Sequence, residues 1–311
     1  MKKVLITGAA GFIPSSLADA LLATGKYAVV AVDNFVTGKK EFVASHPNYT
    51  FIEADVNEEA AISKVFTEHA FDYVFHYAAL VGVLRTTENP KKVLDDIKGL
   101  QYIFELAKNS SVKRIFFSSS SEVYGEPVHL PQHEYDTPLN SRLPYAVVKN
   151  IAECFCKSYQ QEAGLDYTIF RFFNTYGPRQ SEDFVVAKFI QMAQTGKDIT
   201  IYGDGSQTRT FCYIDDNIEF TLKVLENELL VNDVVNVGDH NLVTVKELAE
   251  IIIKLTGSSS KIIYLPPLKE GDMTRRQPDN SKMSEVLGRE LLPVEHGIKS
   301  ILLSQESVVS P

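Results

Sequence analysis

Short apolar runs alternate with longer amphipathic segments through the first half of this 311-residue chain. The apolar runs are rich in β-branched and aromatic residues and predict strands at 4–7, 27–35, 49–56, 73–79, 114–125 and 167–174. Apolar residues at helical spacing predict helices at 15–24, 58–69, 91–109 and 144–162. Strands and helices that alternate in this way predict an α/β fold, in which helices cover both faces of a doubly wound parallel sheet.

The first strand runs into a glycine turn, "TGAAGFI", that opens a predicted helix. Gly8 and Gly11 stand where a dinucleotide-binding turn needs its first two glycines, because a bare backbone lets a pyrophosphate approach the amides at a helix N-terminus. The third position is Pro14, whose missing N–H is not needed in a first helical turn. We expect the site to survive with a slightly displaced helix and weaker cofactor binding.

Asp33 stands near the end of the second predicted strand. A carboxylate at this place accepts hydrogen bonds from the hydroxyls of an adenine ribose, which favours NAD over NADP. The alternative is a structural glycine turn with an unrelated aspartate. Strand, glycine turn, helix and acid together favour a Rossmann-type NAD site.

The alternation of strands and helices gives way to shorter elements after about residue 175. We therefore predict an NAD-binding Rossmann domain at 1–174, which also takes in part of 208–240. Residues 175–311 are predicted to form a smaller, interleaved C-terminal lobe that binds the substrate and closes over the carboxyl ends of the strands.

Composition narrows the class of protein. The net charge of -9 argues against a general nucleic-acid-binding protein, whose affinity rests on Lys and Arg contacts to phosphate. A locally basic pocket for one phosphate-bearing ligand remains compatible with it. No apolar stretch has the length of a membrane span, and the first apolar run, 4–6, is too short for a signal peptide.

The three cysteines, Cys154, Cys156 and Cys212, have neither CxxC spacing nor metal-ligand spacing. We interpret them as buried thiols of a reducing compartment. The expectation is a cytoplasmic protein without a metal site.

Tyr145 and Lys149 share one face of the last predicted helix, since they are four residues apart. A tyrosine that acts as a base near neutral pH needs a lowered pKa, and a neighbouring ammonium lowers it by favouring the phenolate. Ser120, at the end of the fifth predicted strand, is placed to hydrogen-bond the same substrate hydroxyl. The YxxxK spacing alone is common on helix surfaces, but the glycine turn and the serine run strengthen it.

Eight segments carry a resemblance to a known family: "TGAAGFI", "VDNFVTGKK", "DYVFHYAA", "FFSSSSEVYGEP", "YAVVK", "RFFNTYGPRQ", "YGDGSQTRTFCYIDD" and "NVGD". The chain resembles the extended short-chain dehydrogenase/reductases, in their NAD-dependent nucleotide-sugar epimerase, dehydratase and decarboxylase branch. The resemblance covers nearly the whole chain. It implies an enzyme with a catalytic triad of Ser120, Tyr145 and Lys149, in which Tyr145 deprotonates the sugar 4-hydroxyl while NAD takes the C4 hydride.

The resemblance also implies the cofactor contacts. Lys149 would hold the nicotinamide ribose, Asp55 and Val56 would lie by the adenine, and Ala78 would lie near the cofactor. The residues expected to bind NAD are Gly8, Gly11, Phe12, Ile13, Asp33, Asn34, Asp55, Val56, Ala78, Tyr145 and Lys149.

Substrate contacts follow by the same resemblance. Asn174 and Arg209 match residues that meet the nucleotide diphosphate, and Asp272 lies near an acid that meets the uridine ribose. An arginine fork suits a diphosphate. Asn174 as a loop cap and Asp272 as a solvated turn acid are the alternatives.

The step after C4 oxidation depends on Glu122, which resembles the C5 base of dehydratases and the glutamate of uronate decarboxylases. Arg142 and Arg276 resemble arginines of UDP-glucuronate decarboxylases, and Arg85 lies in a stretch that resembles uronate 4-epimerases. Singly, each arginine is compatible with a surface salt bridge; together they favour an acidic sugar. The residues expected to bind substrate are Arg85, Ser121, Arg142, Asn174, Arg209, Asp272 and Arg276.

Three departures keep the reaction open. Ser121 replaces the aspartate of many 4,6-dehydratases, "PRQSEDFVV" is shorter than the decarboxylase loop, and Asp96 stands where the family often has asparagine. We favour C5/C6 lyase chemistry driven by Glu122 on a UDP-sugar. A 4-epimerase is the alternative, and a non-catalytic NAD-binding sensor is a more distant one.

The helices at 91–109 and 145–163 carry apolar residues beyond one face, among them Ile151, Phe155 and Tyr159. Family members often dimerise through these two helices as a four-helix bundle, so the resemblance implies a homodimer. Packing of the same residues on the sheet is the alternative. We expect neither a nucleic-acid nor a membrane partner.

Overall fold

The computed structural model describes residues 1–267 and 275–309, with residues 83, 84, 87 and 306–309 described by their backbone alone. The chain divides into two compact units. Unit 1 is Met1–Gly125, Leu139–Phe172 and Phe220–Val235; unit 2 is Glu126–Pro138, Phe173–Glu219 and Asn236–Pro311. The domain boundary placed after residue 174 from the sequence stays a prediction.

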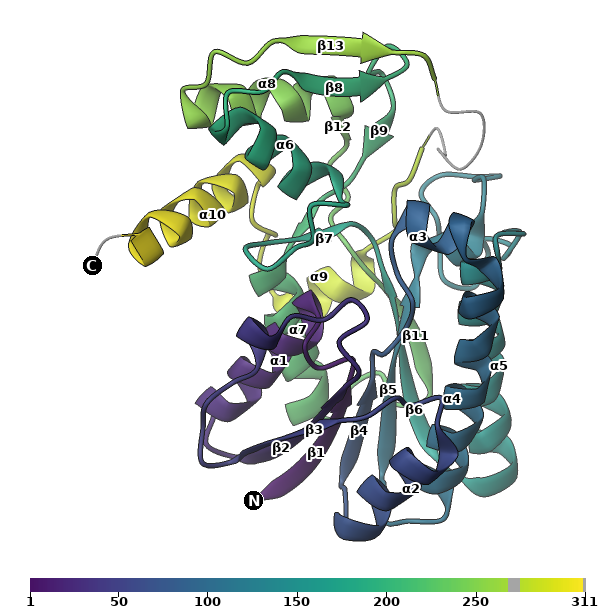
Figure 1. Ribbon diagram of the computed structural model, residues 1–311. Coiled ribbons are helices and arrows are strands. Elements are labelled where there is room, and N and C mark those ends of the chain that lie inside the picture. The colour runs from purple at the N-terminus through teal and green to yellow at the C-terminus, as the bar shows by residue number, and fades with distance from the viewer. Residues whose placement is uncertain (268–274, 310–311) are drawn as a thin grey trace. The chain divides into compact units, whose positions relative to one another are not determined.

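A seven-stranded sheet in the order β11-β6-β5-β4-β1-β2-β3 is the centre of unit 1 (Figure 1). Its strands are β1 (Lys2–Thr7), β2 (Tyr27–Asp33), β3 (Tyr49–Glu53), β4 (Tyr73–His76), β5 (Arg114–Ser120), β6 (Asp166–Phe172) and β11 (Asp233–Val237). β1 pairs in parallel with both β2 and β4, so the strand order reverses between β1 and β4. The predicted doubly wound α/β fold is confirmed, and β11 joins the six predicted strands at the sheet edge.

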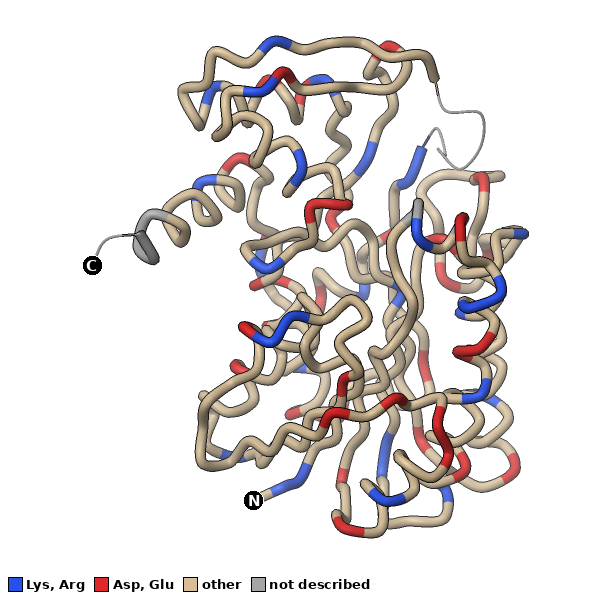
Figure 2. The backbone as a smooth tube through the Cα atoms, viewed as in Figure 1, with Lys and Arg blue, Asp and Glu red and all other residues tan. Residues whose placement is uncertain are grey.

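Helices cover both faces of this sheet, with α1 on one face and α2, α4 and α5 on the other (Figure 1). Their bounds are α1 (Phe12–Ala23), α2 (Glu59–Glu68), α4 (Pro90–Lys108) and α5 (Pro144–Ala163). Charges of both signs lie along α4 (Figure 2), while its apolar residues pack inward. The four predicted helices are confirmed, and the short helix α3 (Val83–Glu88) was not predicted.

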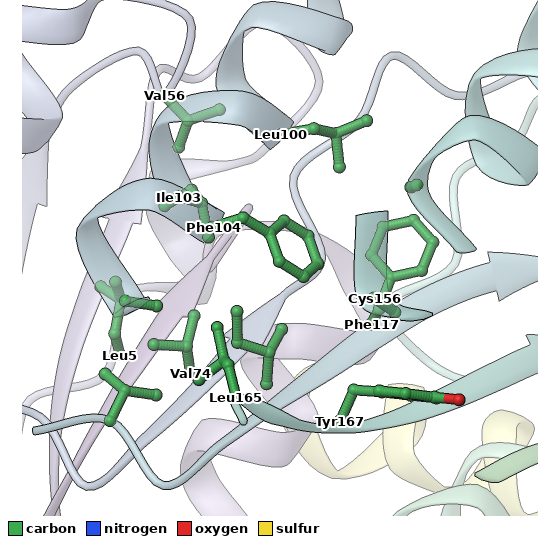
Figure 3. Packing of buried hydrophobic residues seen from close by; sticks show 14 of the residues in the cluster. Leu5, Val56, Val74, Leu100, Ile103, Phe104, Phe117, Cys156, Leu165 and Tyr167 are labelled. Carbon is green, nitrogen blue, oxygen red and sulfur yellow. The ribbon is translucent and has the colours of Figure 1, made fainter. Parts of the chain in front are cut away.

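Successive side chains of a strand point to opposite faces of the sheet, so the sheet packs against a helical layer on each face. On one face of the sheet, Phe116 stacks on Phe75 at a ring-centroid distance of 4.4 Å. Phe170 lies on the same face, between Phe116 and Phe220 of α7 (Ile214–Glu226), and contacts both rings. Phe117 points to the opposite face and joins the cluster with Phe104 of α4 (Figure 3). Both faces of β5 are therefore buried, as expected of a central parallel strand.

A buried ion pair crosses from α5 to β6 within unit 1. Arg171 donates to Glu153 through Nε at 2.9 Å and Nη2 at 2.7 Å, with both side chains 2% exposed. Ser119 Oγ donates to Glu153 at 2.5 Å, and Arg171 Nη1 donates to Tyr124 Oη at 2.8 Å. The ion pair thus hydrogen-bonds Ser119 before Ser120 and Tyr124 after it, and so fixes the segment that follows β5.

Unit 2 consists mostly of short strands and of helices of moderate length. They are β7 (Thr175–Tyr176), α6 (Val185–Gln194), β8 (Ile199–Tyr202), β9 (Thr208–Arg209), β10 (Cys212–Tyr213), β12 (Val243–Thr244), α8 (Val245–Thr256), β13 (Ile262–Leu265), α9 (Ser281–Leu287) and α10 (Val294–Val309), with α7 divided between the units. Thr244 and Glu247 form a capping box at the start of α8. Throughout the part of the chain that the structure describes, every helix is too short or too polar to cross a bilayer.

Candidate cofactor and active site

The glycine turn after β1 packs directly against the chain that leaves β4. Gly8 has φ +70°, and a Cβ placed on it would lie 2.9 Å from the Cα and N of Ala78. Gly11 donates its N–H to Gly8 O at 2.9 Å, and a Cβ on Gly11 would lie 3.0 Å from that oxygen. Gly8 therefore needs glycine for its backbone conformation and the close approach, and the tight turn at Gly11 favours it. The turn lies at the point where the strand order reverses, which is where open α/β sheets bind ligands.

Pro14 is buried in the first turn of α1, which starts at Phe12 rather than at the predicted residue 15. Ser15 donates its N–H to Gly11 O at 3.1 Å, so the helix proceeds normally past the proline. The helix accommodates Pro14 because the first N–H groups of a helix have no intrahelical acceptor, so the N–H that proline lacks is not missed. The weaker NAD binding expected from Pro14 stays a prediction.

Asp33 braces the glycine turn from the end of β2. Its carboxylate accepts the N–H of Ala10 at 2.9 Å and the N–H of Phe35 at 2.7 Å, and only 7% of the residue is exposed. Burial raises the pKa of Asp33, and the N–H donors oppose that rise. Next to it, Asn34 Nδ2 donates to Asp55 Oδ2 at 2.9 Å. Four residues predicted to bind NAD, Gly8, Asp33, Asn34 and Asp55, thus lie at the carboxyl ends of β1, β2 and β3.

A pocket lies in unit 1 beside α4 and α5. Its lining residues are Val56, Asn57, His76, Ala78, Ala79, Asp96, Leu100, Phe117, Tyr145, Val148 and Lys149. The structure therefore brings together Tyr145, Lys149, Val56 and Ala78, which sequence reasoning placed at the cofactor. Pro14 does not line this pocket.

Lys149 is a buried cation on the wall of this pocket. Its Nζ donates to Ser118 O at 2.6 Å and to Ser118 Oγ at 3.3 Å. The same ammonium lies 4.9 Å from the ring centroid of Phe117 and 5.7 Å from that of Tyr145. Burial lowers the pKa of Lys149 to about 8. The ammonium therefore lies near the tyrosine ring, where a positive charge favours the phenolate.

His76 was not among the predicted site residues. Thr7 Oγ1 accepts the N–H groups of Tyr77 and Ala78, each at 3.1 Å, and lies 2.8 Å from His76 Nδ1. Because a hydroxyl has one proton and two acceptor positions, Thr7 donates to Nδ1, and the neutral ring carries its proton on Nε2. Burial lowers the pKa of His76 to about 3, so the ring stays neutral. A histidine that ends a buried strand, in "FHYAA", is the sequence signal for this residue.

Ser120, Ser121 and Glu122 stand where β5 ends and the 3-10 helix η2 (Ser121–Tyr124) begins. Ser120 Oγ accepts the N–H of Glu122 at 3.2 Å and caps this turn. Ser121 is buried, and so is the Oε2 atom of Glu122. β5 thus carries Ser118, which binds Lys149, and ends at Ser120.

The other predicted substrate residues are divided between the units. In unit 1, Arg85 of α3 donates to Val81 O at 2.9 Å, and Arg142 is exposed just before α5. In unit 2, Asn174 has φ +40° and donates through Nδ2 to Thr210 O at 3.0 Å, while Arg209 Nη1 donates to Thr208 O at 2.9 Å.

Two further substrate candidates follow in the chain. Arg276 is buried at 8% exposure. Asp272 lies outside the described residues.

The profile of the NAD dependent epimerase/dehydratase family matches residues 4–238. The chain belongs to this family. It is 35% identical over 300 residues to the UDP-N-acetyl-alpha-D-glucosaminuronate decarboxylase of Bacillus cytotoxicus, covering 92% of this chain and 91% of that protein. It is also 35% identical to UDP-glucuronic acid decarboxylase 1 of Danio rerio, covering 97% of this chain and 72% of the fish protein.

Solved structures of the family are similar over the full fold. The UDP-glucose 4-epimerase of Thermotoga maritima, solved with UDP-glucose, superposes with a TM-score of 0.91 at 33% identity, covering 98% of this chain and 99% of that one. The UDP-glucuronic acid 4-epimerase of Bacillus cereus, solved with UDP-glucuronic acid and NAD, gives a TM-score of 0.88 at 30% identity with the same coverage of both chains. The predicted family, enzyme class and NAD cofactor are confirmed by these findings.

The residues of this epimerase/dehydratase fit an NAD molecule. Gly8 and Gly11 form a cradle that a Cβ would fill, and the first amides of α1 follow directly. The glycine turn, Asp33 and the pocket with Tyr145 and Lys149 all belong to unit 1. The roles of the individual residues in binding NAD stay predictions.

Replacing Gly8 by alanine is expected to lower NAD affinity by about tenfold. The new methyl group would lie 2.9 Å from the backbone of Ala78, so the turn has to shift and its amides move from the place of the pyrophosphate. A loss of about 1.4 kcal/mol in binding corresponds to a tenfold loss of affinity. Isothermal titration with NAD measures the effect. Gly25→Ala is the matched control, because Gly25 has φ +68° and nothing within 4 Å of its Cβ position. Unchanged NAD affinity in Gly8→Ala would contradict a cofactor cradle at this turn.

Proposed function

We propose that this enzyme is an NAD-dependent decarboxylase of a UDP-linked uronic acid, which oxidises C4 of the sugar and then releases C6 as CO2. The observation that carries the proposal is Glu122, held beside Ser120 at the end of β5 by the hydrogen bond from its N–H to Ser120 Oγ. The decarboxylases of Bacillus cytotoxicus and Danio rerio, each 35% identical to this chain, support it.

Oxidation at C4 needs removal of the O4 proton. When bound, NAD accepts the hydride of C4 and returns it at the end of the cycle. Tyr145 takes the O4 proton as its phenolate, the ammonium of Lys149 stabilises that phenolate, and the hydroxyl of Ser120 holds O4 in place. A ketone at C4 follows, which makes the C5 carboxylate a β-keto acid.

Loss of CO2 then breaks the C5–C6 bond. The electron pair of that bond moves toward the C4 carbonyl and forms an enolate, whose oxygen Ser120 and the now protonated Tyr145 stabilise by hydrogen bonding. Glu122, protonated from solvent, gives one proton to C5 and restores the ketone. One proton is consumed for each CO2 released, and the returned hydride completes a UDP-pentose.

The substrate is gripped at both ends in this proposal. Arg209 and Asn174 are assigned to the diphosphate, and Asp272, outside the described residues, is assigned to the uridine ribose. Arginines suit both the diphosphate and the sugar carboxylate, because their guanidinium group binds two oxygens of one anion at once. The residues assigned to the sugar are Arg85, Ser121, Arg142 and Arg276.

A 4-epimerase is the second candidate. The similarity to the UDP-glucose 4-epimerase of Thermotoga maritima and the UDP-glucuronic acid 4-epimerase of Bacillus cereus favours it. In that case the ketone receives the hydride on its other face and no carbon is lost.

Mass analysis of products from UDP-glucuronate, UDP-glucose and UDP-N-acetylglucosamine separates these reactions. The proposal predicts loss of CO2 from UDP-glucuronate and no change in the two neutral sugars. Loss of water from a neutral sugar would identify a dehydratase, and an isomer of unchanged mass, separated from its substrate by chromatography, would identify an epimerase. Either outcome overturns the proposal, as would NAD binding without any product.

Glu122→Gln is expected to lower the steady-state rate of CO2 release by about a hundredfold, since the variant has no proton to give to C5 and the enolate left after the first CO2 delays the next turnover. Release of CO2 from carboxyl-labelled UDP-glucuronate measures this. Glu126→Gln, at an exposed position four residues on, is the control and is expected to keep the wild-type rate. Full turnover in Glu122→Gln would show that the Glu122 carboxyl group does not take part in the reaction.

We also propose that the enzyme works in the cytoplasm as a homodimer. Its cysteines are free thiols, which suits a reducing compartment; Cys156 and Cys212 are buried as expected, whereas Cys154 is exposed and was wrongly expected to be buried. The partly buried Phe155 and Tyr159 of α5 and the exposed Leu94 of α4 support pairing through these two helices. Light scattering of the purified protein tests the dimer, and a monomer mass would contradict it.

A further inference from the structure

Asp96 of α4 lies in the same pocket as Tyr145 and Lys149. Its Oδ2 accepts the N–H of Leu80 at 2.9 Å, and its Oδ1 accepts from Asn57 Nδ2 at 3.3 Å. Both oxygens therefore face donors, one from the chain after β4 and one from the chain after β3.

The orientation of Asn57 is fixed by a neighbour that can only donate. Gly99 gives its N–H to Asn57 Oδ1 at 3.0 Å, and a Cβ on Gly99 would lie 2.6 Å from that oxygen. The amide nitrogen of Asn57 must then point to Asp96. An asparagine at position 96 would turn its own NH2 group toward one of the two donors, so these two donors favour a carboxylate with two accepting oxygens.

We propose that Asp96 is a positioning residue for Lys149: its ionised carboxylate keeps the buried ammonium protonated, so that Lys149 can stabilise the phenolate of Tyr145. The proposal rests on the proposed function only for the role of Lys149 in turnover. Its electrostatic part concerns the free enzyme and is tested there.

The groups around Lys149 explain why a counter-charge is needed. His76 from β4, as a neutral ring, Tyr145 one turn away on α5, and Asp96 from α4 line the same pocket as Lys149. Burial raises the pKa of Asp96, as does Asp55, while the hydrogen bonds from Leu80 and Asn57 and the charge of Lys149 oppose that rise. Burial disfavours the ammonium and lowers the pKa of Lys149 to about 8, and the negative charge of Asp96 opposes that fall. Without this charge the Lys149 pKa would move further down, and the lysine would lose its proton near neutral pH.

The test compares Asp96→Asn with the wild type by NMR titration of protein labelled with ¹³C at lysine Cε. The Lys149 signal is identified by its absence from Lys149→Met. We expect the midpoint of Lys149 to fall by about one pH unit in Asp96→Asn. The fall of kcat/KM at alkaline pH is expected to begin about one pH unit lower in the variant. At pH values above the Lys149 midpoints of both enzymes, kcat/KM of Asp96→Asn is then about tenfold below that of the wild type, and at pH values below both midpoints the two are equal. Asp95→Asn is the matched control, because Asp95 lies on the same helix and pairs at the surface with Lys98.

Two further variants keep the test decisive. Asp96→Glu retains the charge and is expected to keep the wild-type midpoint, and Asp96→Ser takes the place of Asp96→Asn if the latter does not fold. An unchanged Lys149 midpoint in the folded, uncharged variant would overturn the proposal, as would a loss of kcat/KM that is equal at every pH. Absence of CO2 release in the wild type would refute the proposed function and leave the titration result standing.

Discussion

Tyr145→Phe is expected to lower kcat by about 10²–10⁴-fold, because phenylalanine cannot take the proton of the sugar 4-hydroxyl. The pocket should otherwise be preserved, since the ring stays within reach of the Lys149 ammonium. Steady-state kinetics with UDP-glucuronate, together with NAD titration, separates the loss of chemistry from a loss of cofactor.

Tyr159→Phe is the matched control for this substitution. Tyr159 lies on the same helix and donates to Glu105 Oε2 at 3.1 Å, away from the residues of the pocket. We expect its kcat to stay close to that of the wild type. A Tyr145→Phe enzyme that turns over within a few-fold of the wild type would show that another group removes the O4 proton.

Glu153→Gln is expected to lower the free energy of unfolding by about 3–5 kcal/mol. The reason is that Arg171 would keep its charge in a site where both partners are 2% exposed, with no counter-charge opposite it. Burial disfavours the charged form, whereas the Glu153 carboxylate raises the pKa of Arg171. Because a guanidinium does not give up its proton, the full desolvation free energy of the buried charge destabilises the folded variant.

Denaturant unfolding of Glu153→Gln measures this loss of stability. Glu162→Gln, on the exposed face of the same helix, is the control and is expected to change the free energy of unfolding by less than about 0.5 kcal/mol. Since the pair binds Ser119 and Tyr124 on either side of Ser120, we also expect a lower kcat in the folded Glu153→Gln protein. Stability equal to that of the wild type would mean that solvent reaches Arg171.

The sequence predicted the fold correctly where runs of apolar residues coincide with strands and helices that are buried in the structure. The alternating apolar runs mark β1 to β6, and Gly164, with φ +69°, ends α5 at a position where glycine is the usual residue. The start of α1 was placed three residues late, because the helical spacing of apolar residues was counted only from the residue after Pro14. β11 was missed because a strand at a sheet edge pairs with a segment distant in sequence, which periodicity does not reveal.

The candidate site followed from motifs only in part. The spacing of Tyr145 and Lys149 was readable, but the partners of Lys149 are contributed by β4, β5 and α4 and depend on tertiary packing. The Nε2–H form of His76 depends on which groups Thr7 accepts, and no local pattern encodes that choice. That Asp33 faces a ribose stays a prediction, and the hydrogen bond from Ala10 to its carboxylate could not be read from the sequence.

The proposed reaction is tested most directly by proton NMR of the sugar product that the enzyme forms from UDP-glucuronate in D2O. The expected product is a UDP-pentose that keeps its original hydrogen at C4 and carries one deuterium at C5. Retention at C4 would show that the hydride leaves and returns without meeting solvent, and deuterium at C5 would mark the proton given after CO2 departs. Deuterium at C4, or a six-carbon product with its carboxylate intact and no deuterium at C5, would contradict the mechanism proposed for Tyr145 and Glu122.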